Sequence, residues 1–378
     1  MRIDRIRVHV FRAPTPRPVA TSFGVMRDRP AVFVRLDGSD GAHGWGEIFA
    51  NWPAAGAEHR ARLLMEDMAD LVLGRGVEAP EQLFDVLTRQ TRIRALQCGE
   101  WGPFRQVTAG LDTAMHDLFA RRAGLSLAAY LSEGAGGAVP VYASGLQVSA
   151  AQDGIAAARA RGIKAFKVKV GFDARRDLED LRMLAAGLQA GEHLMADANQ
   201  AWSLEEALDF ARSAGDLGLA WLEEPIRADS PLADWRQLAH AFAIPLAAGE
   251  NMVEFEGFAS AIESGAFTVL QPDVAKWGGV SGCLTVARHT VAAGLRYCPH
   301  FLGGGIGLLA SAHLLAAAGG DGMLELDANE NPLRDSFVGQ HPVAEGRFPI
   351  AEGPGLGIDT LPEEIAQFGT LMLDTARN

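Results

Sequence analysis

The chain has 378 residues, of which 48% are hydrophobic and 21% charged, an ordinary balance for a globular protein. This length holds a barrel of about 250 residues together with a second unit. The formal net charge of −13, with no long Lys or Arg cluster, argues against nucleic acids and anionic membrane surfaces as partners. Three cysteines without paired spacing, and a start that has no signal-peptide pattern, predict a cytoplasmic protein.

The first 128 residues have the pattern of an α+β unit. Alternating apolar residues predict a small antiparallel sheet with strands at 3–11, 31–36 and 43–49. Helical periodicity predicts three helices, at about 56–73, 79–90 and 103–122. The proline-rich segment 14–30 and the stretch 51–53 are predicted to be irregular loops of the kind that serve as lids.

From residue 129 to 328, short apolar segments recur roughly every 25 residues, the length that a parallel strand with its covering helix requires. The segments lie at 139–143, 166–169, 194–197, 221–224, 246–250, 269–273, 297–300 and 324–325. They predict eight strands of a (β/α)₈ barrel, with 306–318 as a covering helix that is too short to span a membrane. Residues 329–378 are expected to end in a strand-like stretch and a short helix that pack back on the first unit.

Polar residues occur where these predicted strands end, and strand ends converge at the open mouth of a barrel. Asp197, Glu223 and Glu250 end three successive strands, where their charges would repel unless a cation lay between them. An all-oxygen ligand set suits Mg²⁺. The alternative is that each carboxylate pairs with an arginine or caps a helix, but three on consecutive strands favour a metal site.

Two lysines lie two residues apart in the segment 166–169, so Lys167 and Lys169 point to the same side, which in a barrel is the interior. Two ammonium groups that face one cavity are expected to have lowered pKa values, which would suit a general base. On a solvated edge strand the same pair would be ordinary surface charge.

Three further positions end the last predicted strands. Asp273 and His300 are on adjacent strands, where a carboxylate can orient an imidazole and raise its basicity. Glu325 is expected either to hydrogen-bond a substrate oxygen, if protonated or held close to it, or to form a structural salt bridge. The glycines 303–305 are interpreted as space for a substrate and the start of a helix.

Six ordered motifs carry a family resemblance: Phe-Lys-Val-Lys-Val-Gly at 166–171, Asp-Ala-Asn-Gln at 197–200, Trp-Leu-Glu-Glu-Pro at 221–225, Gly-Glu-Asn at 249–251, Gln-Pro-Asp-Val-Ala-Lys-Trp-Gly-Gly at 271–279 and Pro-His at 299–300. The chain resembles the mandelate racemase branch of the enolase superfamily over nearly its whole length. This implies a modified (β/α)₈ barrel and an N-terminal capping domain that the C-terminal segment completes.

The resemblance also implies residue roles. One Mg²⁺ per subunit would lie on Asp197, Glu223 and Glu250, with Lys169 as the base on one face of the substrate and the His300–Asp273 dyad on the other. Lys167 resembles the lysine that helps to neutralise the substrate carboxylate, Asn199 a residue that meets the α-hydroxyl, and Glu325 the glutamate near the carboxylate. Asp273 stands where the muconate cycloisomerase and dipeptide epimerase branches usually have a second lysine, which speaks against those branches.

The implied common step is removal of the proton α to a carboxylate from a small hydroxy-carboxylate substrate. Dehydration of a sugar acid or diacid to a 2-keto acid is favoured. The alternatives are racemisation or epimerisation of a 2-hydroxy acid, cycloisomerisation of a sugar-acid lactone, and a catalytically inactive binding protein. A homo-oligomer is implied by the family alone. The capping-loop residues Thr21, Ser22, Arg27, Asn51 and Trp52 offer polar contacts and an aromatic wall, and Thr21 and Trp52 are predicted substrate contacts.

Overall fold

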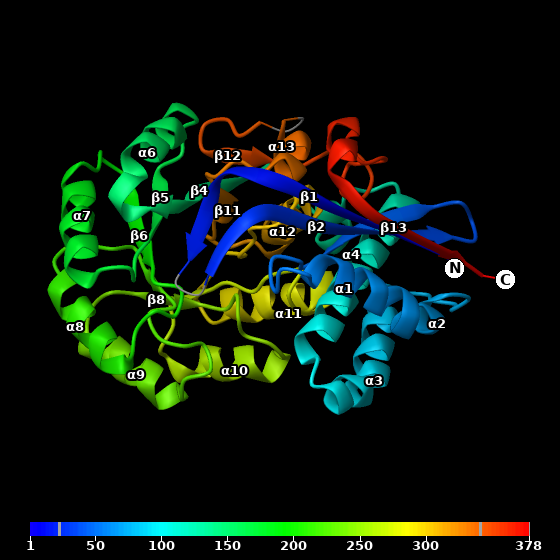
Figure 1. Ribbon diagram of the computed structural model, residues 1–378, viewed down its shortest axis with the longest axis horizontal. Helices are drawn as coiled ribbons and strands as arrows, with labels where there is room; N and C mark the ends of the chain where they lie inside the picture. The colour runs from blue at the N-terminus through cyan, green and yellow to red at the C-terminus, as the bar shows by residue number, and fades with distance from the viewer. Residues whose placement is uncertain (22–23, 340–341, 378) are drawn as a thin grey trace.

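The computed structural model describes residues 1–21, 24–339 and 342–377, without the side chains of Arg17, Ala20 and Thr21. It contains an antiparallel sheet with its helices, the capping unit, and a larger parallel sheet surrounded by helices, the barrel (Figure 1). The two chain ends lie close together on the side of the capping unit that faces away from the barrel (Figure 1).

The capping sheet has four strands in the order β13-β1-β2-β3. They are β1 (Ile3–Thr21), β2 (Gly24–Gly38), β3 (His43–Ile48) and β13 (Gly369–Ala376). The last strand of the chain therefore pairs antiparallel with the first, in register from Arg5 with Ala376 to Val10 with Leu371. The short helix of the tail, a 3₁₀ turn at Glu363–Phe368, precedes this strand, whereas we expected it to follow.

Helices cover one face of the capping sheet. They are α1 (Gly56–Leu63), a π-helical turn (Leu64–Met68), α2 (Ala69–Val72), α3 (Glu81–Cys98), α4 (Trp101–Arg122) and α5 (Leu127–Leu131). The predicted helix at 56–73 is present but interrupted by the π turn, and the one at 79–90 continues to Cys98. Helix α4 lies directly on β3, because a Cβ on Gly44 or Gly46 would come within about 2 Å of the α4 backbone.

The proline-rich segment 14–30 is not an irregular loop, and this prediction was wrong. Strand β1 continues to Thr21 and β2 begins at Gly24, so the segment forms a long two-stranded hairpin. The register shifts between Pro14 and Val19, which leaves residues 15–18 outside the regular pairing. A bulge of this kind tolerates prolines, which have no N–H to donate.

The barrel sheet contains eight parallel strands in the order β10-β9-β8-β7-β6-β5-β4-β11. They are β4 (Ala138–Gln147), β5 (Ala165–Lys169), β6 (His193–Asp197), β7 (Leu222–Glu223), β8 (Leu246–Ala248), β9 (Val269–Leu270), β10 (Arg296–Tyr297) and β11 (Leu324–Asp327). This arrangement confirms the predicted modified (β/α)₈ architecture. Within the described residues no ladder joins β10 to β11, while the short strand β12 (Arg347–Pro349) pairs antiparallel with β4.

Helices follow the barrel strands in regular alternation and surround the sheet (Figure 1). They are a 3₁₀ turn (Val148–Ala150), α6 (Ala151–Ala160), α7 (Ala174–Ala186), α8 (Leu204–Ala214), α9 (Leu232–Ala241), α10 (Phe255–Ser264), α11 (Gly279–Ala292), α12 (Gly305–Ala318) and α13 (Pro332–Val338). In the described part of the chain, no helix combines the length and apolar character needed to cross a membrane.

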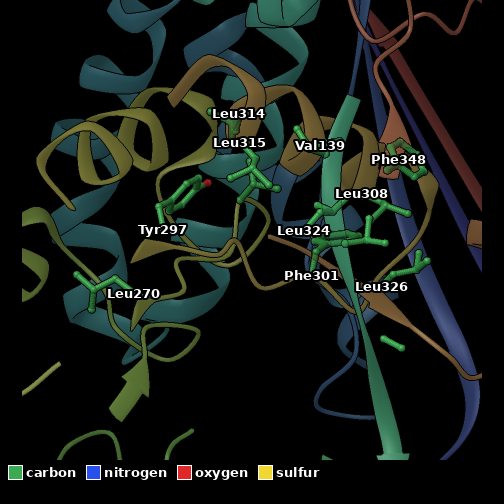
Figure 2. Close-up of a cluster of buried hydrophobic side chains, with 14 of the residues drawn as sticks. Val139, Leu270, Tyr297, Phe301, Leu308, Leu314, Leu315, Leu324, Leu326 and Phe348 are labelled. Carbon is green, nitrogen blue, oxygen red and sulfur yellow. The ribbon is translucent and has the colours of Figure 1, made fainter. Parts of the chain in front are cut away.

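The main core lies where the barrel strands meet α12 (Figure 2). Leu308, Leu314 and Leu315 of α12 pack with Leu324 and Leu326 of β11. Nearly every residue of α12 is buried because the helix also contacts β3, α5 and α13. This burial explains why the helix is apolar all round rather than along one stripe.

Three buried carboxylates of the capping unit accept backbone N–H groups from other parts of the chain. Glu47 accepts those of Gly304 and Gly307 at the start of α12, and Asp112 accepts that of Ser281 in α11. Asp117 accepts those of Trp45 and Leu356. Burial raises the pKa of Glu47 to about 8, of Asp112 to about 7 and of Asp117 to about 6.

We predict that Asp112 makes stability depend on pH. Between its usual pKa of about 3.9 and the folded value of about 7, the folded state binds a proton that the unfolded state lacks, so stability falls as pH rises. Asp112→Asn cannot ionise but still accepts the Ser281 N–H. Its free energy of unfolding relative to the wild type should rise by roughly 1 to 2 kcal/mol between pH 5 and 7. Thermal or denaturant unfolding across this range tests the prediction. The exposed control Asp153→Asn should show no such trend. If the free energies of unfolding of Asp112→Asn and the wild type changed in parallel with pH, Asp112 would not cause the pH dependence.

Candidate active site

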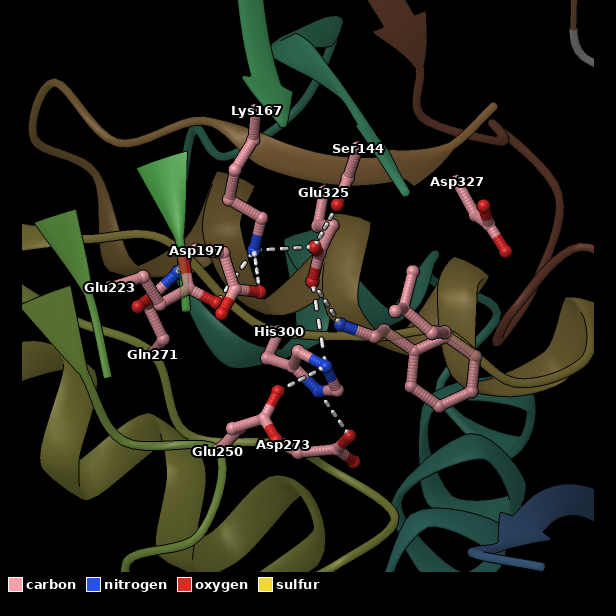
Figure 3. Close-up of polar contacts among 12 residues, drawn as sticks. Ser144, Lys167, Asp197, Glu223, Glu250, Gln271, Asp273, His300, Glu325 and Asp327 are labelled. Carbon is pink, nitrogen blue, oxygen red and sulfur yellow. Dashed lines mark hydrogen bonds and ion pairs between the residues drawn. The ribbon is translucent and has the colours of Figure 1, made fainter. Parts of the chain in front are cut away.

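The predicted polar residues converge at the C-terminal ends of the barrel strands (Figure 3). Lys167 and Lys169 lie in β5, Asp197 ends β6 and Glu223 ends β7. Glu250, Asp273 and His300 lie in the loops directly after β8, β9 and β10, and Glu325 lies in β11. All eight side chains are buried. The structure therefore brings the proposed catalytic and metal-binding residues into one network.

Both lysines are paired with carboxylates. Lys167 Nζ lies 2.6 Å from Glu223 Oε1 and 2.8 Å from Glu325 Oε1, and Lys169 Nζ lies 2.5 Å from Asp197 Oδ2. Burial alone would lower both lysine pKa values, but these carboxylates outweigh it, so the pKa of Lys167 is raised well above its usual value and that of Lys169 is also raised. The expected lowering was wrong because the paired carboxylates act more strongly than the second ammonium group.

His300 and Asp273 form the expected pair. His300 Nδ1 lies 2.7 Å from Asp273 Oδ2, and its Nε2 lies 2.7 Å from Glu250 Oε2. Asp273 Oδ1 accepts the N–H groups of Ala275 and Lys276, which fixes the carboxylate. Burial would lower the pKa of His300, but the surrounding carboxylates raise it well above its usual value. The carboxylates beside both ring nitrogens therefore favour the protonated form of the imidazole.

Glu325 is an acceptor in this network. It accepts from Ser144 Oγ at 2.5 Å, from the N–H of Phe301 at 3.1 Å and from Lys167. Burial opposes ionisation, but Lys167 and His300 dominate and lower the pKa of Glu325 to about 2. Glu325 is therefore ionised and paired with Lys167, which is the salt-bridge alternative that the sequence left open. A contact between Glu325 and the substrate stays a prediction.

The three proposed metal ligands lie on neighbouring strands, but lysines lie among them. Within the described ranges, no three Asp, Glu, His or Cys side chains are arranged to hold a metal ion, since Lys167 and Lys169 contact Asp197 and Glu223 instead. Burial, together with Asp197 and Glu325, raises the pKa of Glu223 to about 7 despite Lys167. The assignment of Asp197, Glu223 and Glu250 as metal ligands stays a prediction.

Two side chains that hold Glu223 were not recognised from the sequence. Trp221 Nε1 and Gln271 Nε2 donate to Glu223 Oε2 at 3.1 and 2.6 Å. Trp221 lies two residues before Glu223 on one strand, so both side chains point to the same side, and this spacing was the available signal. Gln271 precedes Asp273 in the Gln-Pro-Asp motif, which gives no such hint.

Asn199 mainly orients Asp197. Its backbone N–H donates to Asp197 Oδ1 at 2.8 Å, and its Nδ2 lies 3.3 Å from Asp197 Oδ2. Asn199, Gln200 and Glu224 have positive φ angles of 45°, 64° and 37°, which is uncommon for residues other than glycine. Such strain clusters at functional sites when the surrounding structure maintains it.

A cavity of about 70 Å³ lies between the barrel mouth and the capping unit. Lys169, Asn199, Glu250 and His300 line it from the barrel. The capping unit contributes Val19 and Met26 from the β1–β2 hairpin, together with Arg29, Phe49, Asn51 and Trp52. The hairpin reaches across to the barrel mouth (Figure 1).

Trp52 lies at the cavity, and its ring packs against Gly24, where a Cβ would come within 2.6 Å. Its contact with a substrate stays a prediction. The side chain of Thr21 and all of Ser22 lie outside the described residues. Arg27 is exposed and does not line the cavity. Arg29 and Lys276 line it and were not predicted, since neither the proline-rich context of Arg29 nor the spacing of Lys276 from Asp273 indicated a role.

The glycines 303–305 do not provide space for a substrate. A Cβ on Gly304 would lie 2.8 Å from Phe33 and 2.9 Å from Glu47 Oε1, and one on Gly305 would lie 2.2 Å from Phe337. Neighbouring side chains therefore occupy this space. The predicted helix start is present, because α12 begins at Gly305.

Comparisons with known proteins agree with this geometry. Residues 150–364 match the family described as Enolase C-terminal domain-like, and residues 5–132 match the Mandelate racemase / muconate lactonizing enzyme N-terminal domain. The chain belongs to the mandelate racemase/muconate lactonizing enzyme branch of the enolase superfamily.

Three relatives illustrate the range of the family. A mandelate racemase/muconate lactonizing enzyme structure from Bordetella bronchiseptica RB50 is 49% identical with a TM-score of 0.89, covering 95% of this chain and 97% of that one. D-galactarolactone cycloisomerase of Agrobacterium fabrum is 27% identical, over 97% of this chain and 99% of its own length. L-talarate/galactarate dehydratase of Salmonella typhimurium is 31% identical, over 81% of this chain and 75% of its own length.

A structure of that dehydratase, liganded with Mg and L-lyxarohydroxamate, has a TM-score of 0.83 to this chain at 25% identity and covers 100% of this chain and 95% of that one. The relatives thus include both a lyase and an isomerase.

We predict that Lys167 is essential for the stability of the barrel mouth. Lys167→Met leaves Glu223 and Glu325 without their buried cation and should reduce the free energy of unfolding by roughly 3 to 5 kcal/mol. Lys167→Met combined with Glu325→Gln should recover part of this loss, because one unpaired carboxylate is removed. Chemical denaturation in EDTA, with Glu325→Gln alone as the control, measures the coupling. Simple additivity of the two changes would contradict the proposed pairing.

Proposed function

We propose that the protein is a Mg²⁺-dependent dehydratase of a sugar acid or diacid, which removes the α-proton and eliminates the β-hydroxyl to give a 2-keto acid. The observation that carries this proposal is that Lys169 and His300, from different strands, both line one cavity. Asp273 bonds His300 on the side away from Glu250, so the imidazole has a fixed orientation.

The charges at the barrel mouth fit a bound divalent cation. The buried acidic groups connected to the site are Asp197, Glu223, Glu224, Glu250, Asp273 and Glu325. The cationic groups connected to them are Lys167, Lys169, Lys276 and His300. Six acidic groups thus face four cationic ones, and among the described residues Glu224 Oε1 is buried without a hydrogen-bond partner. Burial raises the pKa of Glu224 well above its usual value and that of Glu223 to about 7, so a bound cation would favour their ionised forms. Carboxylate oxygens are the ligands that Mg²⁺ prefers, so Asp197, Glu223 and Glu250 would hold it.

When bound, Mg²⁺ would supply positive charge near the substrate carboxylate. It would also offset the negative charge of Asp197, the carboxylate that holds the Lys169 ammonium group in this structure. Lys169 Nζ, once free of its proton, takes the proton from Cα. Lys167 Nζ balances the negative charge that develops on the carboxylate.

His300 Nε2 then protonates the departing β-hydroxyl, which leaves as water. The resulting enol becomes the 2-keto acid by proton transfer to carbon. His300 suits the role of acid because its neighbouring carboxylates raise its pKa and so favour the protonated form. The amides of Asn51 and Asn199 and the ring of Trp52, which line the same cavity, would contact the hydroxylated chain.

A second candidate is a cycloisomerase of a sugar-acid lactone. The observation that favours it is the similarity to D-galactarolactone cycloisomerase along nearly the full length of both chains. The same α-proton removal would open a lactone if the β-oxygen of the ring were the leaving group. His300 would then protonate a ring oxygen instead of a hydroxyl.

Incubation of the protein with Mg²⁺ and a panel of mono- and diacid sugars and their lactones in D₂O, followed by proton NMR, distinguishes these reactions. We expect a 2-keto acid from one sugar acid. Lys169→Ala and His300→Asn should each reduce the rate at least about 100-fold, because each removes a proton carrier. An isomerised lactone would instead establish the cycloisomerase, and α-deuterium exchange without either product would indicate a racemase or epimerase. Activity that survives both substitutions would disprove the assigned roles.

We also predict that Asp197→Asn weakens Mg²⁺ binding at least about 10-fold, because it removes one negative ligand without changing the side-chain size. Isothermal titration calorimetry with Mg²⁺ alone measures this directly. Asp321→Asn, which changes an exposed carboxylate paired with Arg296, is the control and should bind Mg²⁺ as the wild type does. Equal affinity in Asp197→Asn and wild type would rule out Asp197 as a ligand.

A further inference from the structure

Residues 47–51 of the capping unit, here called the 47–51 segment, lie between the two loops that carry the His300–Asp273 pair. The segment comprises the end of β3 and the residues that follow it. One of its neighbours is the loop after β10, at 298–304, and the other is the loop after β9, at 271–278. Alternate residues of the segment contact these loops.

Glu47 binds the loop that follows His300. Its Oε1 accepts the N–H of Gly304 at 2.5 Å and its Oε2 accepts the N–H of Gly307 at 2.8 Å. Both N–H groups belong to the start of α12, where an anion is favoured. Glu47 is 4% exposed, and a Cβ on Gly304 would lie 2.9 Å from its Oε1. The carboxylate and the loop are therefore in close contact, only four residues after His300.

The next two contacts involve both loops. Asn51 Nδ2 donates to the carbonyl of Leu302 at 3.2 Å, in the His300 loop. The N–H of Phe49 donates to the carbonyl of Ala275 at 3.3 Å, in the Asp273 loop. Lys276 Nζ, from the same loop, lies 5.0 Å from the centre of the Phe49 ring.

The space enclosed by these contacts is very small. A cavity of about 10 Å³ is lined by Glu47, Phe49, Asn51, Asp273 and Leu302, among others. This volume is about that of a single water probe, so the segment and the two loops pack directly against each other. A shift of the 47–51 segment would move both loops.

Lys169 is held differently. Its strand β5 is paired with β4 and β6, and its ammonium group is bonded to Asp197 of β6. These supports all belong to the barrel. The two proton carriers at the cavity thus depend on different parts of the protein.

We propose that the 47–51 segment positions the His300–Asp273 pair, with Glu47 as the principal positioning residue, so that contact between the capping unit and the barrel sets the His300 side of the reaction. This inference rests on the proposed function for its catalytic consequence, but the positioning itself is independent of the reaction.

Glu47→Gln tests the proposal. Gln has the size of Glu, but only its amide oxygen can accept a backbone N–H. Its NH₂ group would face the second N–H, so that two donors would oppose each other. Asp117→Asn is the matched control, since Asp117 is also buried and accepts two backbone N–H groups, but from Trp45 and Leu356. Two measurements are made on both full-length variants. The first is hydrogen–deuterium exchange by mass spectrometry, compared between peptides covering 298–308 and 165–171.

The second measurement is α-proton exchange in D₂O with the two C2 epimers of the sugar acid that the panel above identifies. One epimer presents its α-proton to Lys169 and the other to the fraction of His300 that has lost its proton. In Glu47→Gln we expect faster amide exchange at 298–308 but not at 165–171. Exchange that depends on His300 should fall about 10- to 100-fold, the scale expected from a displaced catalytic group, while exchange that depends on Lys169 stays within about twofold. Asp117→Asn should change neither the amide exchange at 298–308 relative to 165–171 nor the exchange that depends on His300 relative to that which depends on Lys169.

Equal loss of both exchange reactions in Glu47→Gln would show a general structural role and overturn the proposal, as would unchanged amide exchange at 298–308. If the wild type neither forms a 2-keto acid nor shows exchange dependent on Lys169 or His300, the proposed function fails, and the amide exchange alone still decides the positioning. Should Glu47→Gln not fold, Asn51→Leu removes the Leu302 contact, and the same increase at 298–308 is expected.

Discussion

The excess of buried acidic groups over cationic ones at the strand ends is the constraint on which the rest of the site depends. Asp197, Glu223 and Glu325 lie within hydrogen-bonding distance of lysine ammonium groups, and Glu250 lies beside the His300 imidazole. Removing any cation leaves carboxylates buried without compensation, which is far more costly than breaking an exposed ion pair. The same excess makes the site attractive for a divalent cation and raises the pKa of His300. The charged groups that we propose for catalysis are therefore the same groups whose pairing constrains the structure.

The capping unit is bound to the barrel by similar means. Glu47 and Asp112 accept N–H groups at the starts of α12 and α11, the two helices that follow the His300 and Asp273 loops. Helix N-termini carry unpaired N–H groups, so buried carboxylates satisfy donors that would otherwise be costly to bury. Two buried carboxylates of the capping unit therefore hold the side of the barrel that carries the dyad, while Arg29 binds Asp327 at the end of β11.

Much of the fold could be predicted because its signals are local. Each barrel strand is a short apolar run at a regular interval, and each candidate site residue lies in or directly after such a run, so the strand series and the position of these residues at its ends could be predicted. The direction of the Lys169 pKa shift could not be predicted, because it depends on Asp197, a partner on another strand whose distance no local pattern gives. The hairpin at 14–30 was missed because a register shift accommodates prolines that normally oppose a strand. The role of Glu47 was missed because its partners lie about 260 residues further along the chain.

The division of labour between the two units has a consequence for how the site is assembled. Lys169 and Lys167 lie in a five-residue strand hydrogen-bonded on both sides, a rigid element whose geometry the barrel alone determines. His300 and Asp273 lie in loops after very short strands, and such loops need outside support to hold a side chain precisely. The 47–51 segment gives that support and also contributes Phe49 and Asn51 to the wall of the cavity at the barrel mouth. The capping residues that would meet the substrate and those that hold the acid–base pair therefore belong to the same five-residue segment. A substitution in this segment that altered the cavity would also alter the position of His300.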